Sequence, residues 1–385
     1  MESLNALWTF PAIVFAALLI AWAAECGQFY ISQGLALAVL AWVQTLPEFA
    51  VEATIAYEAA QDVTKTHLVI ANFTGSLRLF VGFGWPMIYF TALFFSGEPL
   101  HDRTRGFRRI VMEDQNAITV MGLLPALAYF SWIYCKGTLT MVDGCVLGSV
   151  YGVYMWLLSK LPPQDAEGIE DLGRVPRWVM QRPKAQSIGW LLFLFASGGL
   201  ILWKVAHPFL HSMLALAISL GISQFVFVQW VAPFLSEFPE TLSVFRWAQQ
   251  VKKAPMALTN FVSSSMNQWT LLTGMIPFIY SFGSGHAAQI TFDEHQRVEI
   301  LLTIVQSYLG FLFLASMDFS FVEAVGLFTL WIVQFFVPHV REEIIWVYGA
   351  WAAWETLQLA AHFRERNAFR IVAHVCTETL FKRSA

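Results

Sequence analysis

Long apolar stretches recur along the whole chain and are separated by short polar segments. A transmembrane helix needs about 20 mostly apolar residues, and the pattern predicts ten such spans. They lie near residues 7–26, 31–60, 67–95, 117–135, 139–160, 188–206, 209–248, 255–281, 298–316 and 319–338. The second, third, seventh and eighth are longer than a simple span and carry polar residues in their middle. We therefore expect an all-α integral membrane protein in which several helices are interrupted inside the bilayer.

An apolar segment lies near each end of the chain. The leading segment MESLNA contains Glu2 and no Lys or Arg, so the positive region of a signal peptide is missing and we expect an uncleaved first span. Near the other end, the apolar segment from Ile344 to Ala361 is interrupted by Glu355. This segment is expected to be an eleventh, C-terminal helix, which either spans the membrane or lies in its interface.

Charge supports a membrane location and gives an orientation. Charged residues make up only 13% of the chain, against roughly 25% in soluble proteins. Net charge is −4, and no basic tract indicates a nucleic-acid partner. With eleven spans, most of the 23 Lys and Arg residues fall on one side of the membrane. The positive-inside rule then places the N-terminus outside and the 161–187 linker in the cytoplasm, with the bacterial inner (plasma) membrane as the expected location.

Three short motifs occur twice, in the same order. The first pair is VQTLPE, which ends at Glu48, and LSEFPE, which ends at Glu240. The second pair is ANFTGS, which ends at Ser76, and TNFVSS, which ends at Ser264. The third pair, further along the chain, is IVMEDQ and ITFDEH. The first offset, 192 residues, contains five spans, an odd number, so the two halves must insert with opposite topology. Inverted repeats of this kind are typical of transporters, which bind their substrate between the repeats near the middle of the membrane.

The duplication predicts how the chain is divided. We expect a first five-span repeat at 1–160 with its motif at 43–78, a cytoplasmic linker at 161–187, a second five-span repeat at 188–338 with its motif at 235–268, and a C-terminal helix with a basic tail at 339–385.

Each repeat places a proline and a glutamate inside an apolar span. Pro47 and Pro239 have no N–H, so each leaves a backbone carbonyl of its helix without the usual donor. Glu48 and Glu240 follow directly, and ionisable residues at that depth usually mark an ion pathway. Carboxylate, carbonyl and hydroxyl oxygens are the ligands that Ca²⁺ prefers. We therefore predict that Glu48 and Glu240 bind a metal cation.

Nearby polar residues are candidates to complete this site. Glu52 and Glu237 each lie one helical turn from a motif glutamate and could serve as a further ligand, as a proton site or as a partner for Arg78. Two carboxylates so close together make proton coupling plausible. The expected supporting ligands are Thr45, Asn72, Thr74 and Ser76 from the first half, and Ser236, Thr241, Asn260, Ser263 and Ser264 from the second. Asn72 and Asn260 could instead form hydrogen bonds between helices.

The paired motifs resemble the two repeats of the cation/calcium exchanger superfamily, which includes sodium/calcium and proton/calcium antiporters. The repeats of that superfamily read roughly G-T-S-x-P-E and then G-N-x-x-G-S-N. The resemblance implies ten core spans, a cytoplasmic linker after the fifth, and ion binding by Glu48 and Glu240. Asn72, Ser76, Asn260 and Ser264 match the downstream motif.

The chain departs from that pattern at several positions. Gln44 and Glu237 stand where the superfamily has small or hydroxyl residues, and Leu77 and Ser265 stand where it has asparagine. Arg78 lies within the motif region of the third span. It could form a structural salt bridge with Glu52, act as a tethered cation at a position that an ion fills in relatives, or mark a member that has lost transport.

These observations predict a secondary active antiporter that exchanges Ca²⁺, or another divalent cation, for Na⁺ or H⁺ by alternating access. Its partners are inorganic cations and the lipid bilayer, a homo-oligomer is possible, and no cofactor is expected. The alternative is a non-transporting membrane protein of the same fold that acts as a sensor or scaffold. An enzyme is disfavoured, because no nucleophile–base pair and no HExxH motif is present.

Overall fold

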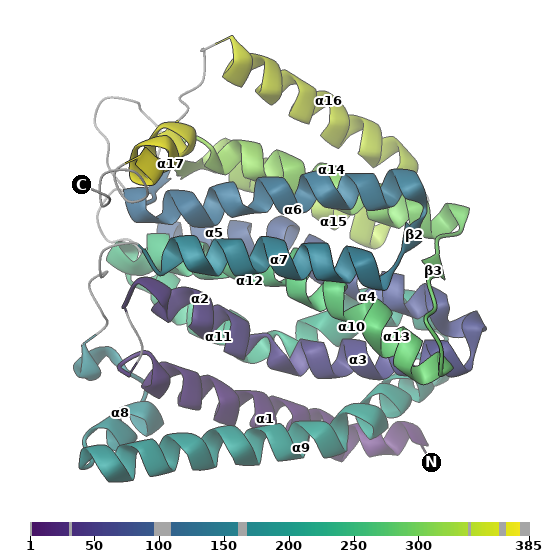
Figure 1. Ribbon diagram of the computed structural model, residues 1–385, viewed down its shortest axis with the longest axis horizontal. Helices are drawn as coiled ribbons and strands as arrows, with labels where there is room; N and C mark the ends of the chain where they lie inside the picture. Colours follow the sequence, from purple (N-terminus) through teal and green to yellow (C-terminus); the bar gives the residue numbers. More distant parts are fainter. Residues whose placement is uncertain are drawn as a thin grey trace. The chain divides into compact units, whose positions relative to one another are not determined.

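Helices dominate the computed structural model, which describes residues 2–30, 33–95, 109–160, 168–337, 340–361 and 367–377. Six helical segments in the described part are long and apolar enough to cross a membrane. They are Ser3–Gly27, Val63–Phe95, Asp114–Lys136, Met141–Leu158, Lys184–Ser219 and Glu294–Leu314. The expectation of an all-α integral membrane protein is confirmed (Figure 1).

The two halves of the chain contribute similar series of elements. The first half contains η1 (Glu2–Asn5), α1 (Ala6–Gly27), α2 (Gln33–Gln44), α3 (Leu46–Gln61), η2 (Val63–Lys65), α4 (Thr66–Leu79), η3 (Phe80–Gly84), α5 (Trp85–Phe95), β1 (Arg109–Val111), η4 (Asp114–Asn116), α6 (Ala117–Lys136), β2 (Thr138–Leu139) and α7 (Met141–Leu158). The second half contains α9 (Lys184–Ser219), α10 (Gln224–Ser236), α11 (Phe238–Gln249), η6 (Val251–Lys253), α12 (Ala254–Asn267), η7 (Gln268–Leu272), α13 (Thr273–Ser284), β3 (Ile290–Thr291), α14 (Glu294–Leu314), β4 (Asp318–Ser320) and α15 (Phe321–Phe336). Between the halves lie η5 (Ile169–Asp171) and α8 (Arg174–Met180), and α16 (Arg341–Ala360) and α17 (Asn367–Cys376) follow.

Interruptions of the helices repeat at the spacing of the sequence motifs. The break between α2 and α3 falls at Thr45, and the break between α10 and α11 falls 192 residues later at Glu237. The segments η3 and η7 are π-helical turns that begin at Phe80 and at Gln268, 188 residues apart, the offset that also separates ANF from TNF. A π-helical turn inside an α-helix is rare and often marks a functional position. The duplication is therefore present in the backbone as well as in the sequence.

Two short antiparallel strand pairs show how the halves are related. In one pair Ile110 of β1 faces Phe319 of β4, and in the other Leu139 of β2 faces Ile290 of β3. Each pair joins one strand from each half, and a shift of 180 residues turns the first pair into the second. All four of these side chains are buried. The two pairs are thus related by an internal twofold symmetry, as the predicted inverted repeats require. The strands themselves were not predicted, because each has only two or three residues.

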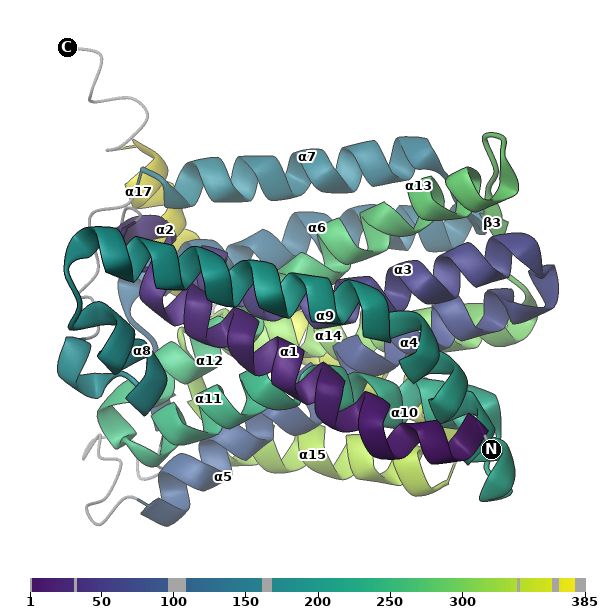
Figure 2. The ribbon, with the colours of Figure 1, turned by 90° about the horizontal axis from the view of Figure 1, so that it is seen from below.

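The first helices of the two halves run in opposite directions. Thr9, near the start of α1, forms a hydroxyl–hydroxyl hydrogen bond of 2.8 Å with Ser212, near the end of α9. Cys26, at the end of α1, belongs to a buried apolar cluster with Leu194, near the start of α9. Figure 2 shows α1 and α9 side by side over their length. This antiparallel pairing is what inverted repeats require.

One predicted boundary is wrong. The sequence analysis placed separate spans at 188–206 and 209–248, but the structure has a single helix, α9, from Lys184 to Ser219. Pro208 suggested a break, yet a proline inside a transmembrane helix can be accommodated by a bend, and the last turns of α9 leave the line of the rest (Figure 2). At about 54 Å, α9 is longer than one span requires. The break in the predicted seventh span comes later, between α10 and α11.

The predicted eleventh segment forms a helix, α16. It packs along α14, where the hydroxyls of Tyr308 and Thr356 lie 3.1 Å apart. Glu355, which interrupts its apolar sequence, accepts a hydrogen bond of 3.1 Å from the Trp351 indole. Part of the predicted 161–187 linker is helical (α8), and residues 161–167 lie outside the described residues.

Contacts divide the chain into two compact units, and each unit takes segments from both halves. The first unit comprises Met1–Gly75, Met155–Leu242 and Met275–Ala288, and the second comprises Ser76–Tyr154, Ser243–Gly274 and Gln289–Ala385. Both motif glutamates lie in the first unit, whereas Asn260, Ser264 and Arg78 lie in the second.

We predict that Gly75→Ala destabilises the protein. A Cβ atom at Gly75 on α4 would lie 1.8 Å from the carbonyl oxygen of Gln229 on α10, so the two helices would have to separate. Overpacking of this kind typically costs about 1–3 kcal/mol. Thermal unfolding of the detergent-solubilised protein should show a lower midpoint for Gly75→Ala. The matched change Gly152→Ala on α7, where nothing lies within 4 Å, should leave the midpoint unchanged or raise it; equal midpoints for the two variants would contradict the close helix contact.

Candidate functional site

The first motif places Glu48 at the start of a helix inside the protein. Helix α2 ends at Gln44, α3 begins at Leu46, and Thr45 between them keeps helical angles (φ −82°, ψ −4°). Pro47 is tolerated in the first turn of α3 because the N–H groups of that turn have no partner within the helix. Glu48 also lies in this turn, where the helix dipole favours a negative side chain.

The second motif repeats this arrangement. Helix α10 ends at Ser236 and α11 begins at Phe238, with Glu240 in its first turn. The interrupting residue, Glu237, has nearly the same angles as its counterpart in the first half (φ −90°, ψ −4°). Its carbonyl accepts a hydrogen bond of 2.9 Å from the Thr241 N–H. In both halves, the helix that follows the break therefore carries a glutamate in its first turn.

Four glutamates of the first unit are almost completely buried. The exposed fractions are 1% for Glu48, 0% for Glu52, 3% for Glu237 and 1% for Glu240. An ionised carboxylate without water is costly unless a cation or hydrogen-bond donors compensate it. The charge of these four carboxylates must therefore be balanced by cations, by protons or by hydrogen-bond donors.

Asn72 is the described partner of Glu52. The Asn72 side-chain NH₂ on α4 donates a hydrogen bond of 2.6 Å to Glu52 Oε2 on α3. The remaining oxygens of this pair, Glu52 Oε1 and Asn72 Oδ1, are buried and accept no hydrogen bond from any residue that the structure describes. Buried acceptor oxygens of this kind are suitable ligands for a hard cation. The structure thus brings together two residues that the sequence analysis proposed separately.

Several predicted hydroxyl ligands donate hydrogen bonds to carbonyls one helical turn earlier in the chain. The hydroxyls of Thr45, Thr74 and Ser236 donate to the carbonyls of Trp42, Ile70 and Pro233 at 2.9, 2.5 and 3.1 Å. Because each hydroxyl gives up only its proton in such a bond, its oxygen can still accept from a donor or bind a cation.

The downstream motif residues of the second unit are buried polar residues. Asn260 and Ser264 are fully buried. Ser76 accepts a hydrogen bond of 2.7 Å from the Gln268 side chain, at the start of the π-helical turn η7. Ser263 lies 3.3 Å from the hydroxyl of Tyr154. Ser76, a residue of the first motif, thus meets a residue of the second.

Arg78 is paired with a residue that the sequence analysis did not single out. Its guanidinium lies 2.5 Å from Glu299 Oε2 on α14, and both side chains are fully buried. Arg341, at the start of α16, pairs with the other oxygen of Glu299. Gln334 accepts a hydrogen bond of 3.2 Å from Arg78, and Gln306 donates one of 3.0 Å to the Arg78 carbonyl. The hypothesis that Arg78 forms a salt bridge with Glu52 is therefore replaced by a salt bridge with Glu299.

Glu299 could have been found from the sequence. Arg78 lies inside a span, so it requires a buried carboxylate nearby, and Glu299 lies inside the predicted span 298–316. Gln306 follows two helical turns later on the same face. Glu52, the carboxylate considered for this salt bridge, instead accepts a hydrogen bond from Asn72.

Comparisons with known proteins give a consistent result. Residues 4–160 and 190–338 match the profile of a family described as sodium/calcium exchanger protein. Among solved structures, the chain is similar to the H⁺/Ca²⁺ exchanger CAX, with a TM-score of 0.88 and 28% identity over 98% of this chain and 92% of that one. The sodium-calcium exchanger NCX_Mj shares the fold, with a TM-score of 0.55 and 16% identity over 88% of this chain and 98% of that one. A search of curated proteins finds no match.

The matched residues include both Pro-Glu motifs, both downstream motifs and the interrupted helices that carry them. They also cover well over half of the chain. The chain therefore belongs to the sodium/calcium exchanger protein family.

Proposed function

We propose that this protein is an antiporter that exchanges Ca²⁺ for protons across the membrane. The observation that carries the proposal is the burial of four glutamates near the helix break of each repeat: Glu48, Glu52, Glu237 and Glu240. Two carboxylates can hold one divalent cation, or they can each hold a proton, but two empty charges in a dry interior are unfavourable. Because the empty site is unfavourable, an ion that leaves it must be replaced by another ion or by protons, and transport therefore takes the form of exchange.

Glu48 and Glu240 are the proposed ion ligands. Each directly follows a proline in the first turn of a helix, so the carbonyl that the proline leaves without a donor is close in sequence and can contribute an oxygen. We propose that Asn72 Oδ1 and Glu52 Oε1 complete the ligand set from the first half. Asn260, Ser264, Ser76, Thr45, Ser236 and Glu237 remain proposed supporting ligands.

Similarity supports protons rather than Na⁺ as the counter-ion. The H⁺/Ca²⁺ exchanger CAX is 28% identical over nearly the whole chain, whereas the likeness to the sodium-calcium exchanger is that of the fold alone. Chemistry agrees with this choice, since a carboxyl group binds a proton directly and needs no further ligands, whereas Na⁺ requires a set of oxygens of its own.

Arg78 is proposed to have a structural role. Its guanidinium is held by Glu299 and Gln334 inside the second unit, and those contacts account for its burial. A tethered cation in place of a transported ion would not need a buried salt bridge with Glu299. The salt bridge instead supports an antiporter in which Arg78 joins α4 to α14.

Transport is proposed to proceed by alternating access in the bacterial inner (plasma) membrane. The N-terminus would lie outside and the 161–187 linker in the cytoplasm, as the distribution of Lys and Arg predicts. The interrupted helices α2–α3 and α10–α11 would hold the ion while the inverted repeats open in turn to each side.

Substitution of either motif glutamate should abolish transport. In vesicles that contain the purified protein, Glu48→Gln and Glu240→Gln should each reduce Ca²⁺ uptake to the level of protein-free vesicles, because a neutral amide cannot balance the charge of Ca²⁺. The matched change Glu113→Gln, at an exposed glutamate near a helix start, should leave uptake unchanged. Uptake by both glutamine variants at the wild-type rate would exclude the proposed site, and absence of uptake by the wild type under every gradient would favour a non-transporting scaffold.

The counter-ion can be identified by the gradient that drives uptake. Vesicles with an acidic interior should accumulate Ca²⁺ against its gradient, and the accumulation should collapse when a protonophore dissipates the pH difference. Vesicles loaded with Na⁺ at uniform pH should accumulate no more than vesicles loaded with K⁺. The reverse result would show that Na⁺ is the counter-ion.

The arginine cluster predicts unequal effects for two substitutions. Glu299→Gln removes the carboxylate that Arg78 and Arg341 share, and loss of a buried ion-pair partner costs about 3–5 kcal/mol. Arg78→Met, which introduces the residue found at the equivalent position Met266, leaves Glu299 paired with Arg341 and should cost less. Thermal unfolding should therefore rank wild type, Arg78→Met and Glu299→Gln in order of decreasing midpoint, and Arg78→Met should retain Ca²⁺ uptake. Complete loss of uptake by a folded Arg78→Met protein would instead indicate a direct part in ion exchange.

A further inference from the structure

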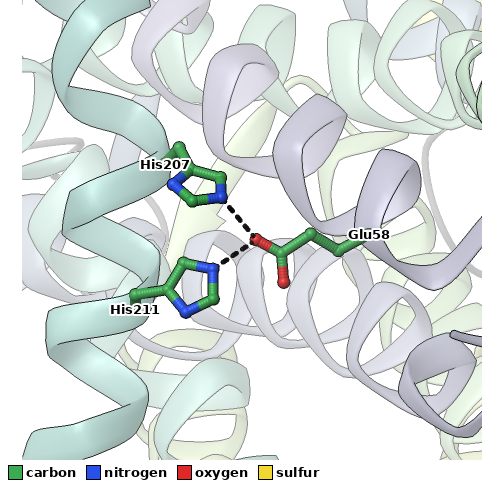
Figure 3. A group of neighbouring side chains, drawn as sticks. All are labelled: Glu58, His207 and His211. Carbon is green, nitrogen blue, oxygen red and sulfur yellow. Dashed lines mark ion pairs between the residues drawn. The ribbon is translucent and has the colours of Figure 1, made fainter. Parts of the chain in front are cut away.

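Two histidines and one glutamate converge on the surface of the first unit, apart from the buried carboxylates (Figure 3). His207 and His211 lie one helical turn apart on α9, and Glu58 lies in the last turn of α3. Glu58 Oε1 is 2.8 Å from His211 Nε2 and 3.5 Å from His207 Nε2. The three ligand atoms all lie within 4.8 Å of one another.

These distances fit the ligands of one small metal ion. At metal–ligand distances of about 2.0–2.2 Å, neighbouring ligands of a tetrahedral zinc ion are about 3.3 Å apart. The two measured separations bracket that value, so small side-chain rotations would place an ion among the three atoms. Histidines at positions i and i+4 of a helix are a common way to present two such ligands on one face.

The arrangement is not accounted for by hydrogen bonds alone. Glu58 Oε1 is buried, yet it accepts no hydrogen bond from any residue in the described part of the chain, although two ring nitrogens are close. The nitrogens therefore approach the oxygen without the geometry of a donor–acceptor pair. Ligand atoms that converge on a shared point in this way are expected around a metal position.

Glu58 is held in place by a positive residue on its other side. Lys65 Nζ lies 2.9 Å from Glu58 Oε2, so Oε1 is the oxygen that faces the histidines. The turn that positions Lys65 is fixed by Asp62, which accepts hydrogen bonds from the N–H and the hydroxyl of Thr64. These bonds keep the pKa of Asp62 below its usual value. A hydrogen-bonded partner that orients a ligating carboxylate is typical of metal sites.

The site is open to its surroundings. The side chains of His207 and His211 are 67% and 40% exposed, whereas that of Glu58 is 12% exposed. Three protein ligands with an open side leave the fourth position of a tetrahedral ion to water. Glu58 is near the end of α3, next to the polar turn 62–65, which places the site at an end of the spans rather than at their middle.

We propose that Glu58, His207 and His211 bind a transition-metal ion of the Zn²⁺ class and thereby join α3 to α9. Two imidazole nitrogens and one carboxylate favour Zn²⁺ over Ca²⁺ and Mg²⁺, which prefer oxygen ligands. The ion links the two halves of the chain, since α3 belongs to the first half and α9 to the second. This site is independent of the proposed exchange of Ca²⁺ at Glu48 and Glu240.

Zinc binding to the purified protein, with any affinity tag removed, tests the proposal. Titration calorimetry in detergent should show one Zn²⁺ site at neutral pH, and Zn²⁺ should raise the thermal unfolding midpoint. His207→Asn, His211→Asn and Glu58→Gln should each weaken binding at least about tenfold and abolish the rise. The matched change His286→Asn, at an exposed histidine after α13, should alter neither quantity.

Two further comparisons keep the result specific. Co²⁺ bound to the wild-type protein should give the visible absorption of a tetrahedral complex, and the three ligand variants should lack it. Glu48→Gln and Glu240→Gln should bind Zn²⁺ as the wild type does. Failure of the zinc proposal can therefore be distinguished from failure of the Ca²⁺ exchange proposal. Absence of Zn²⁺ binding to the wild type, or equal binding by the wild type and both histidine variants, would overturn the proposal.

Discussion

Negative charge buried where two helices are interrupted is the constraint on which the account depends. A carboxylate removed from water must be neutralised by a proton, a cation or several hydrogen bonds. Glu48 and Glu240 each follow a proline in the first turn of a helix, a position that favours negative charge but does not neutralise it. Glu52 has one described hydrogen-bond donor, Asn72. Four buried carboxylates in one unit are the basis on which we propose that this unit takes up cations and protons.

The internal symmetry is clear in the backbone but incomplete in the side chains. The strand pairs, the helix breaks and the π-helical turns all recur at the spacing of the motifs. Arg78, however, corresponds to Met266, and its partner Glu299 corresponds to Thr119, whose hydroxyl instead meets the hydroxyl of Tyr154 at 3.4 Å. In the second unit, Arg78 and Glu299 thus form an ion pair, whereas the equivalent residues Met266 and Thr119 are neutral.

Much of the fold could be predicted because apolar length and repeated motifs are properties of the sequence itself. The interruption near Glu48 followed from Pro47, and its repetition followed from Pro239. What could not be predicted depended on contacts between distant segments. Glu299 was recognisable as a carboxylate inside a span, but no motif shows that α14 packs beside α4, so its pairing with Arg78 was not predicted. The continuous helix α9 was divided because a proline can either end a helix or bend it. The pairing of Glu58 with two histidines depended on that same continuity.

Proton release on Ca²⁺ binding tests the central claim most directly. Calorimetric titrations of Ca²⁺ into the purified protein, repeated in buffers with different ionisation enthalpies, measure how many protons leave for each ion bound. The account predicts that Ca²⁺ binding to the wild type releases protons, with less release at higher pH as the carboxylates lose their protons beforehand, and that Glu48→Gln and Glu240→Gln bind Ca²⁺ weakly or not at all. Tight Ca²⁺ binding with no proton release at any pH, or unchanged binding by both variants, would contradict it.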